Sequence, residues 1–462
     1  PYRRQRQMCI RDRAYTDFIA AIDLGTSHMV GMVGTKNATG ALSIIAYEVE
    51  NSGTCIRRGC VYNVKETASK IRRLILKLEN KLGGAKIGQV YVGLGGQSLR
   101  SIEHTVCKVL GTEGVVTEEI IDSLYQECKD YRPDMLTVLD VVSPSYFLDD
   151  KPESNPVGVP CSRIEARYKL IVGRPSLKLN IINSISEQAK IEIAGILVSP
   201  LALGDVVLSD NEKDLGCALI GFGAGVTTIT VYKGGKLASL SVVPFGGNLI
   251  TKDITNLRVV ESEAERLKIT YGSAKADRDN DMTIQVSLAD GMGLREIKLA
   301  ELNGVIEARM DEILENVYAR LEATGLMSVL GAGIVITGGG AALKNLPAVM
   351  SERLKMEVRY SAVRKGIVAS GDLVVASNPE YAVAVGLLAK GTKNCALYIP
   401  PKPEPKIEPV VEPEPTVEPT PEPVKEKPKK EKKKGPGLFG RLTKGIDTFG
   451  KTLFDDDDNE SK

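Results

Sequence analysis

The chain has 462 residues, of which 43% are hydrophobic and 26% charged, with a formal net charge of +1. This length allows three or four units of roughly 100–150 residues. The near-neutral charge argues against nucleic acid as the main partner, and no run reaches the ~18–20 apolar residues of a membrane-spanning helix. Eight scattered cysteines indicate reduced thiols, and two histidines, His28 and His104, argue against a His-rich metal site or a Ser-His-Asp triad.

The N-terminal segment, residues 1–13, carries five arginines and no core pattern. We interpret it as a non-native or disordered arm and begin the fold near Tyr15.

The first folded segment opens with IAAIDLGTSHMVGMVG (residues 19–34), an apolar strand, a Gly turn with hydroxyls and a second strand. A helix is predicted from Val64, with Asn63 as its N-cap, because Ala68, Ile71, Leu74, Ile75 and Leu78 repeat at helical spacing. Gln89–Leu94 then reads as a buried strand.

Residues 97–178 differ from the preceding segment in their sequence pattern, which predicts a small inserted α+β subdomain. They hold short alternating runs, a helix around Thr117–Lys129 and a Pro-rich turn region. After this segment we expect a helix over Ser186–Ala194, ended by Gly195, and a strand over Ile196–Val198.

A second hairpin follows at GCALIGFGAGVTTITVYKGG (residues 216–235), and a helix-rich insertion at 258–330 separates it from GIVITGGGAALKNLP (333–347). A final helix is predicted over Pro379–Leu388. The order hairpin, insertion, hairpin, insertion indicates an internal duplication with two lobes.

Two Gly-rich hairpins facing each other can hold a nucleotide's phosphates from both sides. Gly25 lets backbone N–H groups approach phosphate oxygens, and the hydroxyls of Thr26 and Ser27 add donors. Asp23 would bind a Mg²⁺ ion through water. Taken alone, this segment also fits an ordinary tight hairpin turn.

The third Gly-rich turn, Gly338, Gly339 and Gly340, follows a buried strand at a helix start and leaves room for adenine or ribose. Glu265 and Lys268 lie three apart on a helix, so both could reach ribose hydroxyls. The alternatives are a plain strand-to-helix turn and a surface ion pair. The joint occurrence of all these motifs, in this order, favours a nucleotide site.

These three segments resemble the phosphate-1, phosphate-2 and adenosine motifs of the actin-like ATPase superfamily, and within it the FtsA family of bacterial cell-division proteins. VYVGLGGQSLRS (90–101), VPFGGNLITKDI (243–254), AERLKITYG (264–272) and NPEYAVAVGLL (378–388) extend the resemblance over residues 17–392. It implies ATP binding in an interdomain cleft, polymerisation, and recruitment of the tubulin-like protein FtsZ to the membrane. The insertion 258–330 would be the place where the family binds the FtsZ C-terminal peptide.

The second hairpin departs from the family pattern, which has an Asp, three glycines, Thr and a second Asp. Here Gly221 and Thr228 stand at the two acidic positions. Gly223 and Gly225 still offer backbone N–H groups, and Thr227 and Thr228 keep hydroxyls. Phosphoryl transfer needs a well-held metal and a positioned water. We therefore expect nucleotide binding with weak or absent hydrolysis, and we assign no catalytic residue.

The C-terminal segment after Tyr398 changes composition. Residues 400–428 hold 11 of the 23 prolines and predict an extended linker. A helix at 435–454 then places a set of large apolar residues on one face and basic residues on the other. The apolar set is Leu438, Phe439, Leu442, Ile446, Phe449 and Leu453, and the basic set is Arg441, Lys444 and Lys451. This pattern predicts an amphipathic anchor for an anionic membrane surface; the alternative is that the helix docks on a partner protein or folds back.

The sequence therefore predicts a two-lobed actin-like (ribonuclease H-like) α/β fold with an inserted α+β subdomain, a disordered linker and an amphipathic helix. Its expected function is that of an ATP- and Mg-binding adaptor that polymerises, tethers the FtsZ ring at the septum as a peripheral protein of the cytoplasmic (inner) membrane face, and recruits later division proteins. A pilus-assembly adaptor and a turnover ATPase or chaperone are the alternatives.

The predicted parts are an arm (1–14), first lobe (15–96 and 179–200), inserted subdomain (97–178), second lobe (201–257 and 331–398), second-lobe insertion (258–330), linker (399–434), helix (435–454) and acidic tail (455–462).

Overall fold

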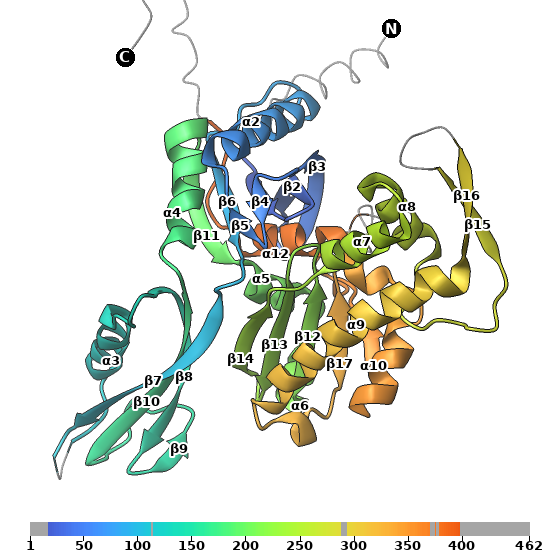
Figure 1. Ribbon diagram of the computed structural model, residues 1–462. Coiled ribbons are helices and arrows are strands. Elements are labelled where there is room, and N and C mark those ends of the chain that lie inside the picture. The colour runs from blue at the N-terminus through green and yellow to red at the C-terminus, as the bar shows by residue number, and fades with distance from the viewer. Residues whose placement is uncertain (1–16, 112–113, 288–292, 370–374, 376–377, 398–462) are drawn as a thin grey trace, which may run out of the picture. The chain divides into compact units, whose positions relative to one another are not determined.

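The structure is a computed structural model of the whole chain, and it describes residues 17–111, 114–287, 293–369, 375 and 378–397 (Figure 1). The predicted arm, the linker at 399–434 and the amphipathic helix at 435–454 lie outside the described residues. The architecture below is that of the folded unit that ends near residue 400.

The first lobe is built on a five-stranded sheet in the order β11-β6-β1-β2-β3. The first three strands in sequence form an antiparallel meander, whereas β6 runs parallel to β1 and β11 runs parallel to β6. Its strands are β1 (Ile19–Leu24), β2 (His28–Lys36), β3 (Leu42–Asn51), β6 (Gln89–Leu94) and β11 (Glu192–Val198).

The second lobe repeats this arrangement in the sheet order β14-β13-β12-β17-β18. Again a meander is followed by two strands that run parallel to its first strand. The members are β12 (Cys217–Phe222), β13 (Thr227–Lys233), β14 (Lys236–Val243), β17 (Ile334–Thr337) and β18 (Val358–Tyr360). The strand orders confirm the internal duplication that was predicted from the two hairpins.

A separate antiparallel sheet, ordered β7-β10-β8-β9, follows the first lobe's β6 (Figure 1). It consists of β7 (Arg100–Val109), β8 (Thr137–Leu148), β9 (Lys151–Glu153) and β10 (Arg163–Gly173). Helix α3 (Glu118–Asp130) begins at the N-cap Thr117 and covers this sheet with Leu124 and Cys128. The sheet meets the second lobe where the Ser101 hydroxyl accepts from the N–H of Leu240 at 2.8 Å.

The helices of the first lobe follow the sequence pattern in one case and depart from it in another. Helix α2 (Val64–Lys81) begins at Asn63, whose side chain accepts from the Glu66 N–H as predicted. The helix predicted over Ser186–Ala194 was wrong in its bounds. Helix α4 (Ser176–Ile182) continues into a π-helical turn (Asn183–Ala189) and ends at Lys190, which adopts left-handed backbone angles.

Gly195, the residue that was expected to end that helix, lies inside strand β11 at a register shift against β6. A Cβ there would lie 3.0 Å from the ring of Tyr91, so the glycine leaves space for an aromatic side chain. Gly195 therefore allows close packing within a strand and does not end a helix.

The second-lobe insertion is less helical than predicted. Its helices α8 (Glu261–Tyr271) and α9 (Leu299–Glu322) pack on the second sheet's core, as does α7 (Gly247–Ile254), which precedes the insertion. A hairpin of β15 (Thr283–Ser287) and β16 (Leu294–Lys298) stands between α8 and α9. Polar and apolar residues alternate through Thr283–Ser287, with Ile284 and Val286 buried, so this strand pattern was present in the sequence and was missed. Short elements complete the chain: β4 (Ile56–Arg57), β5 (Cys60–Val61), α6 (Asp210–Leu215), α10 (Leu346–Leu354) and 3₁₀ turns at Thr255–Leu257, Met327–Val329, Gly339–Ala342 and Pro379–Tyr381.

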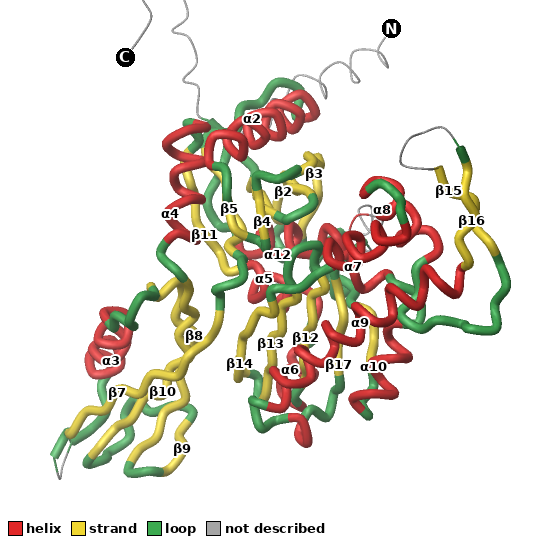
Figure 2. Tube along the Cα trace, viewed as in Figure 1, coloured by secondary structure: helices red, strands yellow, loops and turns green. Residues whose placement is uncertain are grey.

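Two helices lie between the two sheets, as Figure 2 shows: α5 (Ser199–Val207) and α12 (Ala382–Lys390). Helix α5 contacts β11 of the first sheet and β13 of the second, and α12 packs on α5. At their crossing, a Cβ on Gly386 would lie 2.3 Å from the Ala202 carbonyl oxygen. The two backbones therefore touch directly, and this contact joins the lobes.

Gly386→Ala is expected to destabilise the fold by about 1–3 kcal/mol, because overpacking at this crossing forces the helices apart. Gly304→Ala in α9 is the matched control, since nothing lies within 4 Å of its added Cβ. A gain of about 0.5–1 kcal/mol is expected there from helix propensity. Urea unfolding monitored by circular dichroism measures both, and equal effects of the two substitutions would contradict the direct backbone contact.

Candidate functional site

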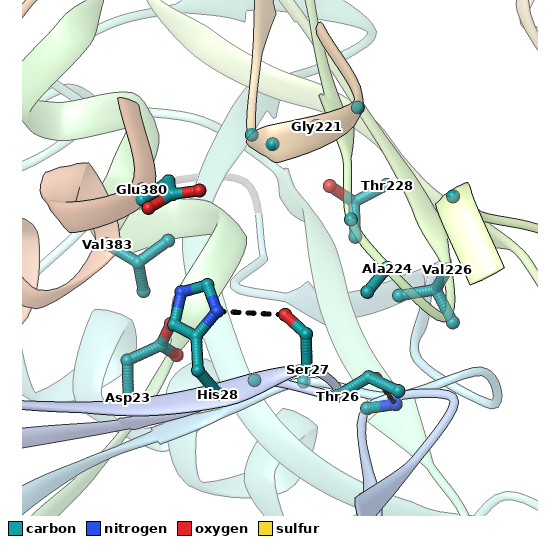
Figure 3. A pocket seen from close by; sticks show the side chains of 18 of the residues that line it. Asp23, Thr26, Ser27, His28, Gly221, Ala224, Val226, Thr228, Glu380 and Val383 are labelled. Atoms are coloured by element: carbon teal, nitrogen blue, oxygen red, sulfur yellow. Dashed lines mark hydrogen bonds between the residues drawn. The ribbon is translucent and has the colours of Figure 1, made fainter. Parts of the chain in front are cut away.

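A cleft of about 430 Å³ lies where the carboxyl ends of the central strands of both sheets meet. It is lined by the turn after β1, the turn after β12, the turn after β17, the start of α5 and one face of α8. Figure 3 shows the wall carrying Asp23 and His28 opposite the wall carrying Gly221 and Thr228. Ligand sites of α/β sheets characteristically occupy this position beyond the strand ends.

Eleven of the thirteen residues predicted to bind a nucleotide line this single cleft. They come from segments up to 317 positions apart in the chain, from residue 23 to residue 340. The eleven are Asp23, Gly25, Thr26, Ser27, Gly223, Thr228, Glu265, Lys268, Gly338, Gly339 and Gly340. The fold thus brings the separate motifs together, while their role in ligand binding stays a prediction.

The first wall is formed by residues 23–28, the turn between β1 and β2. A Cβ on Gly25 would lie 2.4 Å from the His28 carbonyl oxygen, so the tight turn requires glycine. Thr26 is held in place because its hydroxyl accepts from the N–H of Gly59 at 2.9 Å. The Ser27 hydroxyl lies 2.9 Å from Nδ1 of His28 (Figure 3).

Asp23 is the one carboxylate of the first wall. Burial raises its pKa to about 6, with a smaller opposing contribution from the Leu24 backbone N–H. Among the described residues it has no ion-pair partner. Asp23 is half-buried, and its desolvation makes the charged form costly, so a bound cation would favour the charged form.

The second wall is formed by residues 221–228, the turn between β12 and β13. Gly221, Gly223, Ala224, Val226 and Thr228 line the cleft, and none of these side chains is acidic. Gly223 is required by the turn, because a Cβ there would lie 2.9 Å from the Val226 carbonyl oxygen. This wall therefore presents backbone groups and one side-chain hydroxyl, that of Thr228, to the cleft.

Two predicted residues of this wall do not line the cleft. Thr227 is fully buried, and its hydroxyl donates to the Phe245 carbonyl oxygen at 3.0 Å. Gly225 packs against the first lobe, where an added Cβ would lie 2.7 Å from the Thr26 hydroxyl oxygen. Thr227 thus fixes the turn, and Gly225 allows the two walls to touch.

The remaining side of the cleft carries the residues assigned to adenosine. Nζ of Lys268 lies 2.7 Å from Oε2 of Glu265 and 2.8 Å from the Thr251 hydroxyl, so the pair is an ion pair that also lines the cleft. The ion pair that was the alternative interpretation of these two residues is therefore present, and their contact with a ribose stays a prediction.

The glycines of the third turn serve different ends. Gly338 has φ +87, and a Cβ there would also clash with the Phe222 carbonyl oxygen at 2.5 Å. Gly339 differs, because a Cβ would meet only Oε1 of Glu380, at 3.6 Å. Its missing side chain opens the cleft and is not needed for packing.

Several lining residues were missed from the sequence: His28, Ser199, Thr337 and Glu380. His28 directly follows the Gly-Thr-Ser turn, and Glu380 lies in the quoted segment 378–388, so position next to a motif was the available signal. Ser199 is the first residue of α5 and directly follows β11. The predicted strand, Ile196–Val198, had the correct end, but β11 begins earlier, at Glu192. Thr337 ends the buried strand before Gly338.

The lining charges favour a ligand that brings a cation. Asp23, Glu265 and Glu380 are acidic, whereas Lys268 is already paired with Glu265, which leaves His28 as the other basic side chain of the described lining. The volume lies within the roughly 300–1,000 Å³ of small-molecule sites. No cluster of three metal-ligating side chains occurs among the described residues. The volume and the lining therefore suit a small ligand, and the binding of Mg²⁺ by Asp23 through water stays a prediction.

The protonation of Asp23 makes the free energy of unfolding depend on pH. Because its pKa is 3.8 in the unfolded reference and about 6 in the fold, the folded state binds the proton more tightly between these values. Its contribution to stability is present at low pH and is lost as the pH rises through 6. Asp23→Asn is therefore expected to stabilise the ligand-free protein by up to about 3 kcal/mol at pH 7.5, and by little at pH 4.

Urea unfolding at the two pH values measures this difference, with Asp130→Asn at the exposed end of α3 as the control. A stabilisation by Asp23→Asn that did not change with pH would contradict the assignment to the buried charge.

Comparison with known proteins agrees with this fold. The family model described as "Cell division protein FtsA" matches residues 218–386. The cell division protein FtsA of Porphyromonas gingivalis is 39% identical over 382 residues, covering 82% of this chain and 79% of the relative. FtsA of Bacillus subtilis is 32% identical over 388 residues, covering 82% and 85%.

A solved structure, the PilM-PilN type IV pilus biogenesis complex, matches the fold with a TM-score of 0.56 over 80% of this chain and 97% of that one. At 15% identity it supports the fold alone. The fold is the actin-like α/β fold that was predicted, and on the sequence relatives the chain belongs to the FtsA family of cell division proteins.

Proposed function

We propose that the chain is an ATP-binding adaptor that polymerises on the cytoplasmic face of the membrane, tethers the FtsZ ring there and recruits later division proteins. The observation that carries this proposal is the asymmetric cleft of an FtsA-family protein. One wall offers the carboxylate of Asp23, and the other offers glycines and the hydroxyl of Thr228.

ATP with Mg²⁺ fits the cleft for reasons given by its residues. The turns at Gly25 and Gly223 present backbone to phosphate oxygens. Glu265 and Lys268, on α8, stand with Gly339 on the side where a ribose and an adenine would lie. Mg²⁺ would supply neutralisation of phosphate charge, and Asp23 would hold it through water.

Weak or absent hydrolysis follows from the second wall, where Gly221 and Thr228 leave no carboxylate to hold a metal or orient water. A turnover ATPase or chaperone is the competing function. Single-turnover hydrolysis with Mg²⁺ at about 1–100 s⁻¹, the range of kinases, would favour that alternative. A pilus-assembly adaptor shares the fold but is disfavoured by the identities to FtsA proteins.

Membrane attachment is assigned to residues 435–454 from their sequence. No helix among the described residues is long and apolar enough to cross a membrane. Burial of an apolar face at the interface, with Arg441, Lys444 and Lys451 beside anionic lipid, would give reversible binding. Polymerisation would make it persistent, because many weak anchors act together.

Gly339→Ala is expected to weaken ATP binding about tenfold, because its methyl group enters the cleft while the fold accommodates it. Gly304→Ala on α9 should leave binding unchanged. Isothermal titration with ATP and Mg²⁺ measures both, with circular dichroism to verify the fold. Unchanged affinity in Gly339→Ala would place the nucleotide elsewhere.

Deletion of residues 436–454 is expected to abolish most sedimentation with anionic vesicles and the co-sedimentation of FtsZ that depends on it. Deletion of the acidic residues 455–462 is the matched control and should preserve both, since those charges do not favour anionic lipid. Vesicle binding by the first variant would contradict the anchor. Failure of the full chain to bring FtsZ to vesicles, with or without ATP, would contradict the adaptor function.

A further inference from the structure

A second contact between the two lobes lies across the cleft from α12. Gly225, in the turn between β12 and β13, faces the first lobe, where an added Cβ would lie 2.7 Å from Oγ1 of Thr26 and 3.0 Å from Cα of Arg58. Figure 3 shows Thr26 and Val226 on one side of the cleft and Val383 of α12 on the other. The cleft therefore lies between this contact and the helices that join the lobes.

Gly225 is required for the space it leaves and not for its backbone angles. Its φ lies outside the left-handed region, so alanine could adopt the same backbone. An alanine methyl group would nevertheless lie closer to the first lobe than ordinary van der Waals contact allows. The two lobes therefore touch at this point because residue 225 has no side chain.

Backbone hydrogen bonds hold both sides of this contact in place. On the second lobe, the Asn248 N–H at the start of α7 donates to the Ala224 carbonyl oxygen at 2.8 Å. On the first lobe, the Gln97 N–H donates to the Arg58 carbonyl oxygen at 3.1 Å. A side chain at residue 225 would meet fixed atoms on either side, so separation of the lobes is the motion that relieves the clash.

Arg58 adopts an unfavourable backbone conformation at this contact. With Gly59 it forms the two-residue turn between β4 and β5, and both residues have positive φ values, +49 and +71. Such turns favour Asn-Gly, and a residue such as arginine at the first position costs free energy. Backbone strain persists where the surrounding structure holds it, frequently at functional sites. Here it places the Arg58 backbone against Gly225.

We propose that the contact between Gly225 and Arg58 is a latch that holds the lobes together and sets how fast a nucleotide enters and leaves the cleft. The proposal rests on ATP binding in this cleft. Neither residue lines the cleft, so the latch acts on the separation of the lobes and not through contact with the ligand. Because the latch is closed in this structure, nucleotide passes through the minor population in which the lobes have separated.

An effect of residue 225 on the bound complex alone is the competing explanation, and kinetics separate the two. A substitution that disturbs only the bound complex changes mainly the dissociation rate. A substitution that opens a latch raises the open population both before and after binding. Association and dissociation rates then rise together, and the affinity changes little.

The test follows binding of the fluorescent analogue mant-ATP, with Mg²⁺, to the full chain by stopped flow. Gly225→Ala is expected to raise the association and dissociation rates about tenfold each and to leave Kd within about threefold of the wild type. Gly225→Val should raise both rates further, because the larger side chain favours separated lobes more strongly. Gly304→Ala on α9, where the methyl group meets nothing within 4 Å, should keep the wild-type rates.

Hydrogen exchange without nucleotide tests the latch independently of ATP binding. In Gly225→Ala, amide exchange in residues 54–61 and 222–226 is expected to rise about tenfold over that of the wild type and of Gly304→Ala, while α2 keeps its wild-type exchange. A rise of the same size in α2 would overturn the assignment to a local contact.

Unchanged binding rates in both Gly225→Ala and Gly225→Val would overturn the proposal, as would a rise in the dissociation rate alone. If the wild-type chain binds no nucleotide, the proposed function fails. Hydrogen exchange still decides in that case whether Gly225 holds the lobes together, so the two failures are distinguishable.

Discussion

Parallel pairing of β6 with β1 and of β17 with β12 is the constraint on which the rest of the structure depends. Because parallel strands end at the same edge of a sheet, the turns that follow these four strands are brought to one side of each lobe. Helices α5 and α12 then join the lobes through the direct backbone contact at Gly386. Two sheet edges that carry backbone-rich turns therefore face one another across a cleft, whatever side chains they present.

The side chains determine what this shared geometry can hold. Asp23 is the last residue but one of β1 and lies half-buried on the first wall, where desolvation disfavours its charged form, so a cation bound beside it would stabilise the carboxylate. Its counterpart in the duplicated sheet is Gly221, which ends the equivalent region of β12 and carries no side chain. The two sheets thus share their strand arrangement, but the second lacks the carboxylate that the first carries at this position. A ligand that carries both phosphate and a divalent cation satisfies the two walls differently.

The sequence predicted the parts of the fold that depend on local pattern. The first hairpin, helix α2 with its cap at Asn63, and strand β6 all follow from side-chain spacing and capping. Gly195 shows where local pattern fails, because the ring of Tyr91, more than 100 positions away, decides what this glycine does. The site behaves in the same way. Gly25 is required by its own turn and was predictable, whereas the placement of Thr227 away from the cleft depends on the Phe245 carbonyl, and the inclusion of Thr337 depends on strand pairing.

Retention and turnover of a nucleotide make opposite demands on the wall that faces Asp23. Turnover needs charge and an oriented water at that wall, and both require an acceptor side chain next to the phosphates. Gly221 cannot provide one, and Thr228 already fills the space above it. Hydroxyl and backbone donors stabilise a bound phosphate in its ground state without activating water. A wall of this composition therefore favours retention of a bound phosphate ligand over its turnover.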